Sequence, residues 1–313
     1  MTSKIFNKID KSNSILILTH ENPDGDAIGS VLAFYHYLKS INKTVDMVIV
    51  DIPKIFDFLP SIDKVLDNTD KEYDLAITVD CATAKRIGQK DDLLSKCKQV
   101  ICIDHHISNE LYGDINYVLG DVSSCCQVIY YLFKDNNITL TKEMAESLIS
   151  GVITDTNGFK NDNVDSNTFK LAADILELGV NIHTIYDKLI CKKSMAKYDL
   201  MRIAMDRLEF INNKIAFTYI LKSDFEKVNA LLGDHEGIVE IGRNINGIEV
   251  SLFIREMEDN LWTISLRSTG VVDVNKIAST IGGGGHFMAA GGKLAGNLDE
   301  VKETLINEIK KAI

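Results

Sequence analysis

The stretch Val100-Ile101-Cys102-Ile103-Asp104-His105-His106 says more about the fold than any other part of this 313-residue chain. An apolar run that ends at once in acidic and imidazole side chains is typical of a buried parallel strand that delivers polar groups to one edge of a sheet. Ligands of open α/β sheets bind outside the carboxyl ends of the strands. We therefore expect residues 104–106 to belong to a ligand-binding site.

Three further segments bring acidic or imidazole side chains to the end of an apolar pattern. At one sheet edge, such groups would repel one another or stay unpaired without a cation, and a divalent metal is the simplest resolution. Each motif also has a plain structural alternative, such as a surface turn, a helix cap or a hydrogen-bonded loop. The side chains are His20, Asp24 and Asp26 after the run 15–18, Asp80 after the run 75–79, and Asp155 after the helical pattern 149–153.

The composition is that of an ordinary globular protein, with 45% hydrophobic and 25% charged residues. The net charge of −11 disfavours a broad basic face for long duplex nucleic acid, but it leaves room for short nucleotides. The six cysteines form no zinc-type CxxC pair, which favours a reduced, cytoplasmic protein. Neither a signal peptide nor an apolar run that could span a membrane is expected, so no membrane partner is predicted.

Alternating strand and helix patterns predict an α/β fold. Its first domain, residues 1–190, is expected to hold a parallel sheet with helices on both faces. Asp26 is expected to cap the helix that follows it. The expected strands are residues 15–19, 44–50, 75–79 and 100–103, and the expected helices are residues 4–11, 27–39, 124–133, 142–153 and 166–178.

The second half predicts a smaller α/β domain, residues 209–313, joined to the first by a linker helix over residues 191–208. Two domains are expected because a chain of this length usually exceeds a single core. Alternation predicts strands over residues 214–221, 247–255 and 261–267, and helical spacing predicts helices over residues 222–232, 275–280, 287–290 and 299–311.

In order and content, these motifs resemble the DHH-superfamily phosphoesterases, specifically the group of nanoRNases and 3′-phosphoadenosine 5′-phosphate phosphatases. The resemblance spans nearly the whole chain. It includes the DHH-associated C-terminal domain through the run Gly282-Gly283-Gly284-Gly285-His286. The superfamily also contains single-strand DNA exonucleases and family II inorganic pyrophosphatases.

The resemblance implies two divalent metal ions, usually Mn²⁺, with Asp80 shared between them. One ion would be held by His20, Asp24 and Asp80, and the other by Asp26, Asp80, His105 and Asp155. Mixed carboxylate and imidazole ligands suit manganese better than calcium. Two such ions can clamp the attacking and leaving oxygens of an in-line displacement.

The remaining catalytic groups also come from the resemblance. Asp104 is assigned to orienting an imidazole. His106 is placed nearest the scissile phosphate, as an electrostatic stabiliser or as the acid for the leaving oxygen. A structural hydrogen bond is the alternative role for His106.

By the same resemblance, the second domain holds the nucleotide's phosphate and base end across an interdomain cleft. A glycine run lets backbone amides approach an anion, and the planar fork of Arg binds phosphate bidentately. Ser123 and Ser124 resemble paired serines at a helix start facing the metals, although an N-cap role alone would explain either. The expected substrate-binding residues are Arg267, Ser268, Gly283, Gly284, Gly285, His286, Ser123 and Ser124, with Arg243 and Arg255 as weaker candidates.

Two departures from the family pattern bear on the site. The fourth motif reads Asp155-Thr156-Asn157-Gly158, where relatives often read Asp-Thr-Gly; Asn tolerates left-handed backbone angles, so the turn can survive. Cys125 and Cys126 follow the paired serines, where relatives commonly carry Thr and an acidic or small residue. Their effect on local polarity and oxidation sensitivity is left open.

The leading hypothesis is a metal-dependent phosphoesterase that hydrolyses very short RNA to mononucleotides. The same site is expected to convert 3′-phosphoadenosine 5′-phosphate to AMP. A processive exonuclease would need a longer positive track than this acidic chain offers. The alternatives are a phosphodiesterase for cyclic di-AMP or its linear dinucleotide, a less favoured inorganic pyrophosphatase, and a catalytically silent nucleotide-binding regulator. No motif fixes the oligomeric state, and a homodimer is left open.

Overall fold

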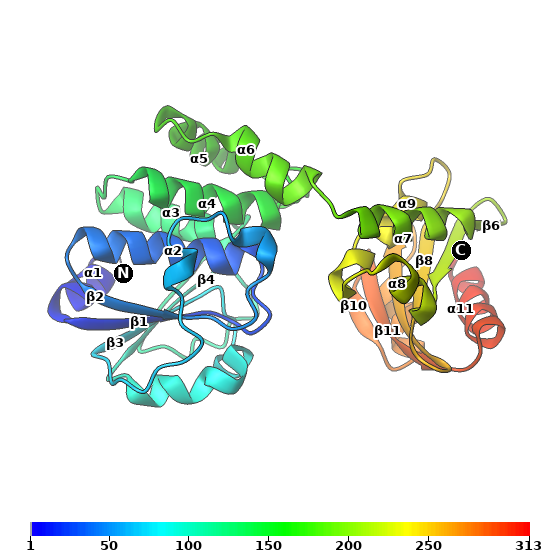
Figure 1. The fold of residues 1–313 in the computed structure, drawn as a ribbon, viewed down its shortest axis with the longest axis horizontal. Helices are drawn as coiled ribbons and strands as arrows, with labels where there is room; N and C mark the ends of the chain where they lie inside the picture. The colour runs from blue at the N-terminus through cyan, green and yellow to red at the C-terminus, as the bar shows by residue number, and fades with distance from the viewer. Residues whose placement is uncertain (1) are drawn as a thin grey trace. The chain divides into compact units, whose positions relative to one another are not determined.

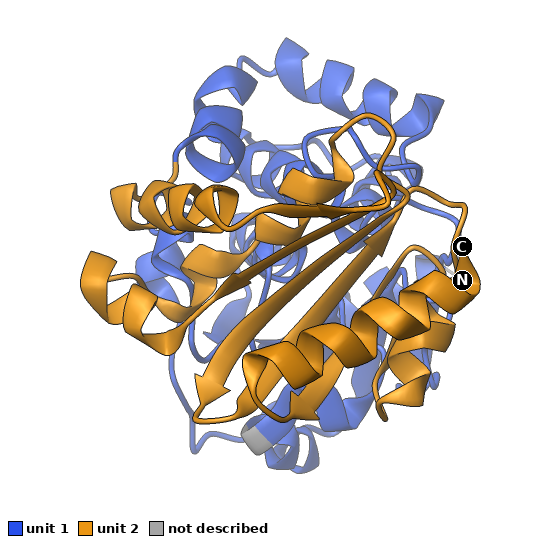
Figure 2. Cartoon of the chain, turned by 90° about the vertical axis from the view of Figure 1, so that its right-hand side faces the viewer, with its two compact units in different colours: residues 1–192 blue, residues 193–313 orange. Residues whose placement is uncertain are grey.

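The computed structural model describes residues 2–313 and divides the chain into two compact units, residues 1–192 and 193–313 (Figure 2). The division lies two residues beyond the predicted end of the first domain. The segment predicted as a separate linker contains helix α7 (Met195–Asp206), which belongs to the second unit. There Leu200 and Ala204 of α7 are buried against Phe253. The expected linker helix is therefore part of the second core.

The first unit is built on a parallel sheet with the strand order β2-β1-β3-β4-β5 within the described residues. The predicted parallel α/β fold is thus confirmed, although the edge strand β5, whose residues are all half-buried, was not predicted. Continuous apolar runs make the central strands inaccessible on both faces. The strands are β1 (Ser14–Leu18), β2 (Thr44–Val48), β3 (Leu75–Val79), β4 (Val100–Asp104) and β5 (Ile115–Val118).

The two faces of this sheet are covered differently (Figure 1). Ile15 and Ile17 pack into the core formed with the α-helices, whereas Leu16 and Leu18 face the segment η3 (Ala84–Lys96), which consists of 3₁₀ turns. Helical segments therefore cover both faces, as predicted, but α-helices cover one face and 3₁₀ turns cover the other. The α-helices are α1 (Thr2–Lys11), α2 (Gly25–Ser40), α3 (Cys125–Asp135) and α4 (Lys142–Asp155), with α5 (Ser166–Glu177), α6 (Ile182–Tyr186) and the π-helical η4 (Asp187–Cys191) following, and the short 3₁₀ turns η1 (Lys54–Phe56) and η2 (Ile62–Lys64) lie between β2 and β3.

Helices α2 and α4 approach closely because each carries a glycine at the contact. A Cβ atom on Gly29 would lie 2.5 Å from the carbonyl oxygen of Ser147 in α4, and one on Gly151 would lie 3.1 Å from Cα of Asp26 in α2. A side chain at either position would force the helices apart. This close packing brings the start of α2, which carries Asp26, beside the end of α4.

The second unit is a mixed sheet with the order β10-β11-β9-β8-β7-β6 among the described strands. Only β7 and β8 pair in parallel there. Helices α10 and α11 cover one face, and α7, α8 and α9 cover the other; Figure 2 shows the long helix α11, near the C-terminus, lying over the strands. The elements are β6 (Glu209–Ile211), β7 (Ile215–Ile220), α8 (Lys222–Val228), η5 (Leu232–His235), α9 (Ile238–Arg243), β8 (Val250–Glu258), β9 (Leu261–Ser268), α10 (Val274–Thr280), β10 (Gly284–His286), β11 (Ala289–Ala295) and α11 (Leu298–Ala312).

The helix predicted over residues 287–290 is wrong, because this segment leads into strand β11. Its short apolar pattern could not distinguish a helical turn from a strand start, and the pairing of Ala289 with both Arg267 and His286 decides for the strand. The helix predicted over residues 222–232 ends at Val228, after which Asn229 takes a left-handed φ of 52°. Across residues 2–313, none of the helices combines the length and apolar character needed to cross a membrane.

Candidate active site

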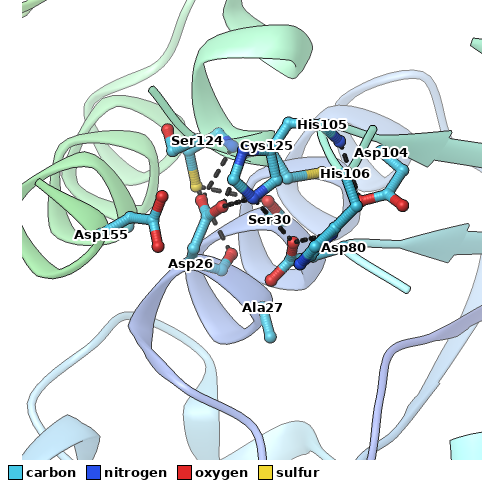
Figure 3. Close-up of polar contacts among 12 residues, drawn as sticks. Asp26, Ala27, Ser30, Asp80, Asp104, His105, His106, Ser124, Cys125 and Asp155 are labelled. Atoms are coloured by element: carbon cyan, nitrogen blue, oxygen red, sulfur yellow. Dashed lines mark hydrogen bonds and ion pairs between the residues drawn. The ribbon is translucent and has the colours of Figure 1, made fainter. Parts of the chain in front are cut away.

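The predicted metal ligands of the first unit gather at the carboxyl edge of its sheet, and Figure 3 shows four of them, Asp26, Asp80, His105 and Asp155. They form three overlapping groups, and in each group one ligand atom per residue lies within 4.8 Å of the others. The edge of a parallel sheet brings together side chains that are far apart in the sequence, here up to 135 positions between His20 and Asp155. The groups are His20, Asp24 and Asp80; Asp80, His105 and His106; and Asp26, His105 and Asp155.

Asp24, not Asp26, is the N-cap of helix α2. Its Oδ1 atom accepts hydrogen bonds from the backbone N–H groups of Asp26 and Ala27, both at 3.0 Å. The predicted cap was therefore placed two residues too late. The capping bonds use Oδ1, which leaves Oδ2 of Asp24 available to a cation.

Asp26 is instead held by the start of another helix. Its Oδ2 atom accepts from the backbone N–H of Cys125 at 2.6 Å, and its Oδ1 atom accepts from that of Cys126 at 2.9 Å (Figure 3). The first N–H groups of a helix have no partner within the helix and carry partial positive charge, so they stabilise a carboxylate there. The two cysteines thus act at this site through their backbone, while their Sγ atoms are buried. No feature of the sequence pointed to this contact.

Asp80 occupies the centre of the ligand groups. It has a left-handed φ of 52°, and its N–H donates to the carbonyl of Ile103 at 3.0 Å, which ties the ends of β3 and β4 together. Its Oδ1 atom is buried and has no hydrogen-bond partner among the described residues. The nearest imidazole nitrogens, Nε2 of His105 and Nδ1 of His106, lie 3.4 and 3.6 Å away. A buried carboxylate oxygen in this state costs free energy unless a cation meets it.

Two imidazoles turn their Nε2 atom toward the carboxylate of Asp80. His20 donates from Nδ1 to the carbonyl of Glu21 at 2.8 Å, so Nε2, 3.6 Å from Asp80 Oδ2, carries the lone pair of the neutral ring. His105 donates from Nδ1 to the carbonyl of Val122 at 3.4 Å, and its Nε2 faces Asp80. Backbone carbonyls commonly fix the tautomer of metal-binding histidines in this way.

The charge balance of the site favours a cation. Burial raises the pKa of Asp155 to about 6, although His105 opposes the shift, and burial together with Asp80 raises the pKa of Asp26 well above its usual range. Burial lowers the pKa of His105, but contact with Asp80 outweighs it and raises that pKa to about 10. Burial raises the pKa of Asp80, but contacts with His105 and His20 outweigh burial and hold that pKa well below its usual range. Crowded, buried carboxylates of this kind are stabilised by divalent cations.

Asp104 contacts an imidazole, as the sequence analysis predicts. Its side chain is fully buried, and its Oδ1 atom accepts from Nδ1 of His106 at 2.8 Å and from the N–H of His105, also at 2.8 Å. The side chain of His106 is 32% exposed, so the outer edge of its ring is open to a ligand.

Asp155 ends helix α4 and faces the carboxylate of Asp26 (Figure 3). The altered fourth motif keeps its turn, because Asn157 and Gly158 adopt left-handed φ angles of 48° and 69°. Asn tolerates this region better than other side chains, so the departure from the family pattern is accommodated locally.

The paired serines have structural roles. Ser124 is the N-cap of α3, where its Oγ atom accepts from the N–H of Gln127 at 3.1 Å. Ser123 donates from Oγ to the side-chain carbonyl of Gln127, and both serines are fully buried. The capping alternative is therefore confirmed for Ser124 alone, and the contact of either serine with substrate stays a prediction.

In the second unit, Arg267 and His286 share one face of the sheet. Both pair with Ala289, from strands on either side of it, and residues paired across neighbouring strands point to the same face. Arg267 donates from Nε to Oε1 of Glu240 at 2.9 Å, and Arg243 donates from Nη1 to Oε2 of the same residue at 3.1 Å. Glu240 therefore orients two arginine side chains, and no motif in the sequence pointed to it.

Ser268 points to the face opposite Arg267, because side chains alternate along a strand, so its predicted contact with substrate remains a prediction that its orientation does not favour. It is fully buried, and its Oγ atom accepts from the N–H groups of Gly270 at 3.1 Å and Val272 at 3.2 Å. Ser268 therefore shapes the turn after β9.

The glycine run forms an exposed edge strand rather than a loop. Gly284, Gly285 and His286 make up β10, which pairs with β11. A Cβ atom on Gly283 would lie 2.9 Å from Cα of Gly292, so glycine is needed for the strands to approach. The run still leaves His286 exposed at the sheet edge.

Comparisons with known proteins agree with this geometry. Residues 14–152 match the DHH family, N-terminal domain, and residues 212–313 match the DHHA1 domain. The chain is 30% identical over 303 residues to the bifunctional oligoribonuclease and PAP phosphatase NrnA of Thermus thermophilus, covering 96% of this chain and 90% of the relative. It is 28% identical to the NrnA protein of Bacillus subtilis, covering 94% of this chain and 93% of that protein.

One solved structure extends the similarity to three dimensions. An exopolyphosphatase-related protein from Bacteroides fragilis matches with a TM-score of 0.90 and 27% identity, over 99% of this chain and 95% of that chain. The two matched domains fall in the two compact units described above, and the ligand groups lie within the first. From its sheet-edge carboxylates and imidazoles and its similarity to relatives along nearly its whole length, the chain belongs to the DHH family of phosphoesterases, which depend on metal ions.

Proposed function

We propose that this chain hydrolyses short oligoribonucleotides to mononucleotides and 3′-phosphoadenosine 5′-phosphate to AMP, using two divalent metal ions, most suitably Mn²⁺. The observation that carries the proposal is the buried Oδ1 atom of Asp80, which has no hydrogen-bond partner among the described residues and belongs to a side chain shared by two of the three ligand groups. The names of the relatives in Thermus thermophilus and Bacillus subtilis support the choice of substrates.

The residues at the sheet edge fit two cations. His20, Asp24 and Asp80 would hold one, and Asp26, Asp80, His105 and Asp155 the other, with the four carboxylates matching the charge of two divalent ions. When bound, the ions polarise the phosphoryl group and supply a nucleophile at neutral pH. Oxygen and imidazole donors together suit manganese, since calcium prefers an all-oxygen shell.

The remaining polar groups have roles in binding and proton transfer. His106, whose ring is anchored through Nδ1 and open at its outer edge, is placed to donate a proton to the leaving oxygen. Arg267 and His286, on one face of the second sheet, are suited to a phosphate of the substrate. Arg267 reaches it already oriented by Glu240, which lowers the entropy lost on binding.

A product time course tests the proposal. Wild-type protein with Mn²⁺ is incubated with RNAs of two to about ten nucleotides, 3′-phosphoadenosine 5′-phosphate, cyclic di-AMP, its linear dinucleotide and pyrophosphate. We expect the shortest RNA to be consumed fastest and the 3′-phosphate to be released, with slower or no turnover of the other compounds. Preferred turnover of cyclic di-AMP or pyrophosphate would replace the proposed substrate class.

A charge-removing variant tests the metal site. Asp80→Asn keeps the side-chain shape, and we expect it to bind less metal and to lose more than about 100-fold in turnover, since removing even an outer partner of a ligand costs about 10–100-fold. Asp67→Asn removes an exposed carboxylate outside the ligand groups and serves as the matched control. Metal content is measured on the same samples. Two ions per wild-type chain and none in Asp80→Asn would agree with the proposal, whereas equal turnover by both variants would refute it.

A further inference from the structure

We propose that Asn109 is a positioning residue, which holds the ring of His106 in place through the carboxylate of Asp104. The inference rests on the function proposed above, because His106 is assigned to the hydrolysis there. Asn109 lies in the loop between β4 and β5 and belongs to none of the ligand groups.

The hydrogen bonds of Asp104 carry the argument. Its Oδ1 atom accepts from His106 Nδ1 at 2.8 Å and from the N–H of His105, while its Oδ2 atom accepts from Nδ2 of Asn109 at 2.6 Å. Both oxygens are therefore bonded, and the carboxylate is fully buried. A buried carboxylate keeps one orientation when both oxygens have donors. Removing the Asn109 donor would free Oδ2 and let the carboxylate rotate away from His106.

The consequence for His106 is a defined tautomer. An ionised carboxylate can only accept, so Asp104 keeps the proton on Nδ1 and leaves Nε2 as the variable nitrogen of the ring. Nδ1 also lies 3.6 Å from Oδ1 of Asp80, so a ring released from Asp104 has a second carboxylate toward which it can turn. By holding Asp104 in place, Asn109 keeps the His106 ring bonded to Asp104 and not to Asp80.

Asn109 is itself firmly placed. Its N–H donates to the carbonyl of His106 at 3.1 Å, and its Oδ1 atom accepts from the N–H of Leu111 at 2.7 Å. The same loop is fastened to the end of β3 by Tyr112, whose hydroxyl donates to Oγ1 of Thr78 at 2.8 Å. The N–H, Oδ1 and Nδ2 groups of Asn109 are thus all bonded, and Nδ2 also lies 3.4 Å from the carbonyl oxygen of Cys81.

Three variants separate positioning from loop stability. Asn109→Asp keeps the shape but offers no donor when ionised, Asn109→Ala removes the side chain, and Tyr112→Phe removes a loop anchor without touching Asp104. We expect kcat to fall about 10–100-fold in both Asn109 variants, the range typical of partners that orient a ligand or catalytic imidazole. KM for dinucleotide RNA should change by less than about threefold, and Tyr112→Phe should keep its kcat.

A spectroscopic measurement tests the same idea without turnover. In metal-free protein labelled with ¹⁵N at histidine, the ring nitrogens of His106 report directly which of them carries the proton. The His106 signals are assigned by their loss in His106→Gln. We expect wild type and Tyr112→Phe to show a single Nδ1–H tautomer, and both Asn109 variants to show a mixture.

The outcomes are distinguishable. A wild-type kcat and an unchanged His106 spectrum in Asn109→Asp would overturn the positioning role. So would a loss of kcat in Tyr112→Phe as large as in the Asn109 variants, since loop stability would then explain both. If wild-type protein hydrolyses no phosphoester while the tautomer still depends on Asn109, the proposed function fails and the positioning geometry stands.

Discussion

Gly151→Ala offers the most direct test of how helix packing builds the metal site. A Cβ atom at this position would overlap Sγ of Cys126 and lie 2.9 Å from Oδ1 of Asp26. Non-bonded heavy atoms prefer separations of about 3.5–4.0 Å, so the added carbon would lie too close to both atoms. Neither neighbour can yield easily, because Asp26 is fixed by two backbone N–H groups and Cys126 is fully buried.

The expected magnitude follows from two opposing effects. Ala is better than Gly in the middle of a helix by about 1 kcal/mol, which favours the variant. Overpacking a tight core costs about 1–3 kcal/mol, and the overlap here places this substitution at the upper end. The net loss should therefore be about 2 kcal/mol of unfolding free energy. For a unit of this size, that corresponds to a fall in Tm of roughly 4–8 °C.

The assay is thermal unfolding of the full chain followed by circular dichroism, with Mn²⁺ affinity measured by calorimetry on the same samples. Asp26 should shift with the helices, so metal affinity should fall together with Tm. Gly233→Ala is the matched control, because a Cβ atom there meets nothing within 4 Å. Adding Cys126→Ala to Gly151→Ala should recover part of the lost stability, which a double-mutant cycle would show as coupling between neighbouring sites.

The opposite result would refute this reasoning. If Gly151→Ala unfolds at or above the wild-type temperature and binds Mn²⁺ normally, helix propensity dominates and α2 and α4 do not meet as closely as described.

Three further outcomes are expected. Burial raises the pKa of Asp155 to about 6, so protonation of Asp155 should compete with metal binding. The rise in Tm caused by Mn²⁺ should therefore be larger at pH 7.5 than at about pH 5, and Asp155→Asn should reduce this pH dependence. In metal-free protein the pH dependence of stability has the opposite sign, because the folded state binds the Asp155 proton more tightly than the unfolded state does. The contribution of Asp155 to stability should therefore decline as pH rises from about 4 to 6, and Asp155→Asn should lose this part of the dependence of Tm on pH. Ser268→Ala should lower the unfolding free energy by about 1–3 kcal/mol, because two backbone donors lose their acceptor, yet KM should stay near wild type below the melting range; a large rise in KM would restore Ser268 to substrate binding. Thiol titration of native protein should label exposed Cys191 quickly and leave Cys125 and Cys126 unmodified until unfolding, since burial raises the pKa of both thiols; rapid labelling of either would contradict their burial.

The sequence by itself determined the α/β class, the central strands and the family. Apolar runs that end in Asp and His encode a buried strand and the place where it ends, and both are local properties. His20, Asp80 and His105 converge because parallel strands deliver their carboxyl ends to one edge, so knowing the strands was enough to place these three side chains together. Residues 287–290 show the limit of such patterns, because a few apolar residues fit either a helix or a strand.

Only the tertiary structure decided which groups support those ligands. Asp26 meets the N–H of Cys125, 99 residues away, because α2, α3 and α4 pack in one particular arrangement. The orientation of Ser268 away from Arg267, and the pairing of Arg267 with Glu240 across 27 residues, likewise depend on strand register and on where α9 lies. A hydrogen bond depends on tenths of an ångström between atoms distant in the chain, whereas sequence periodicity records only whether a side chain is buried.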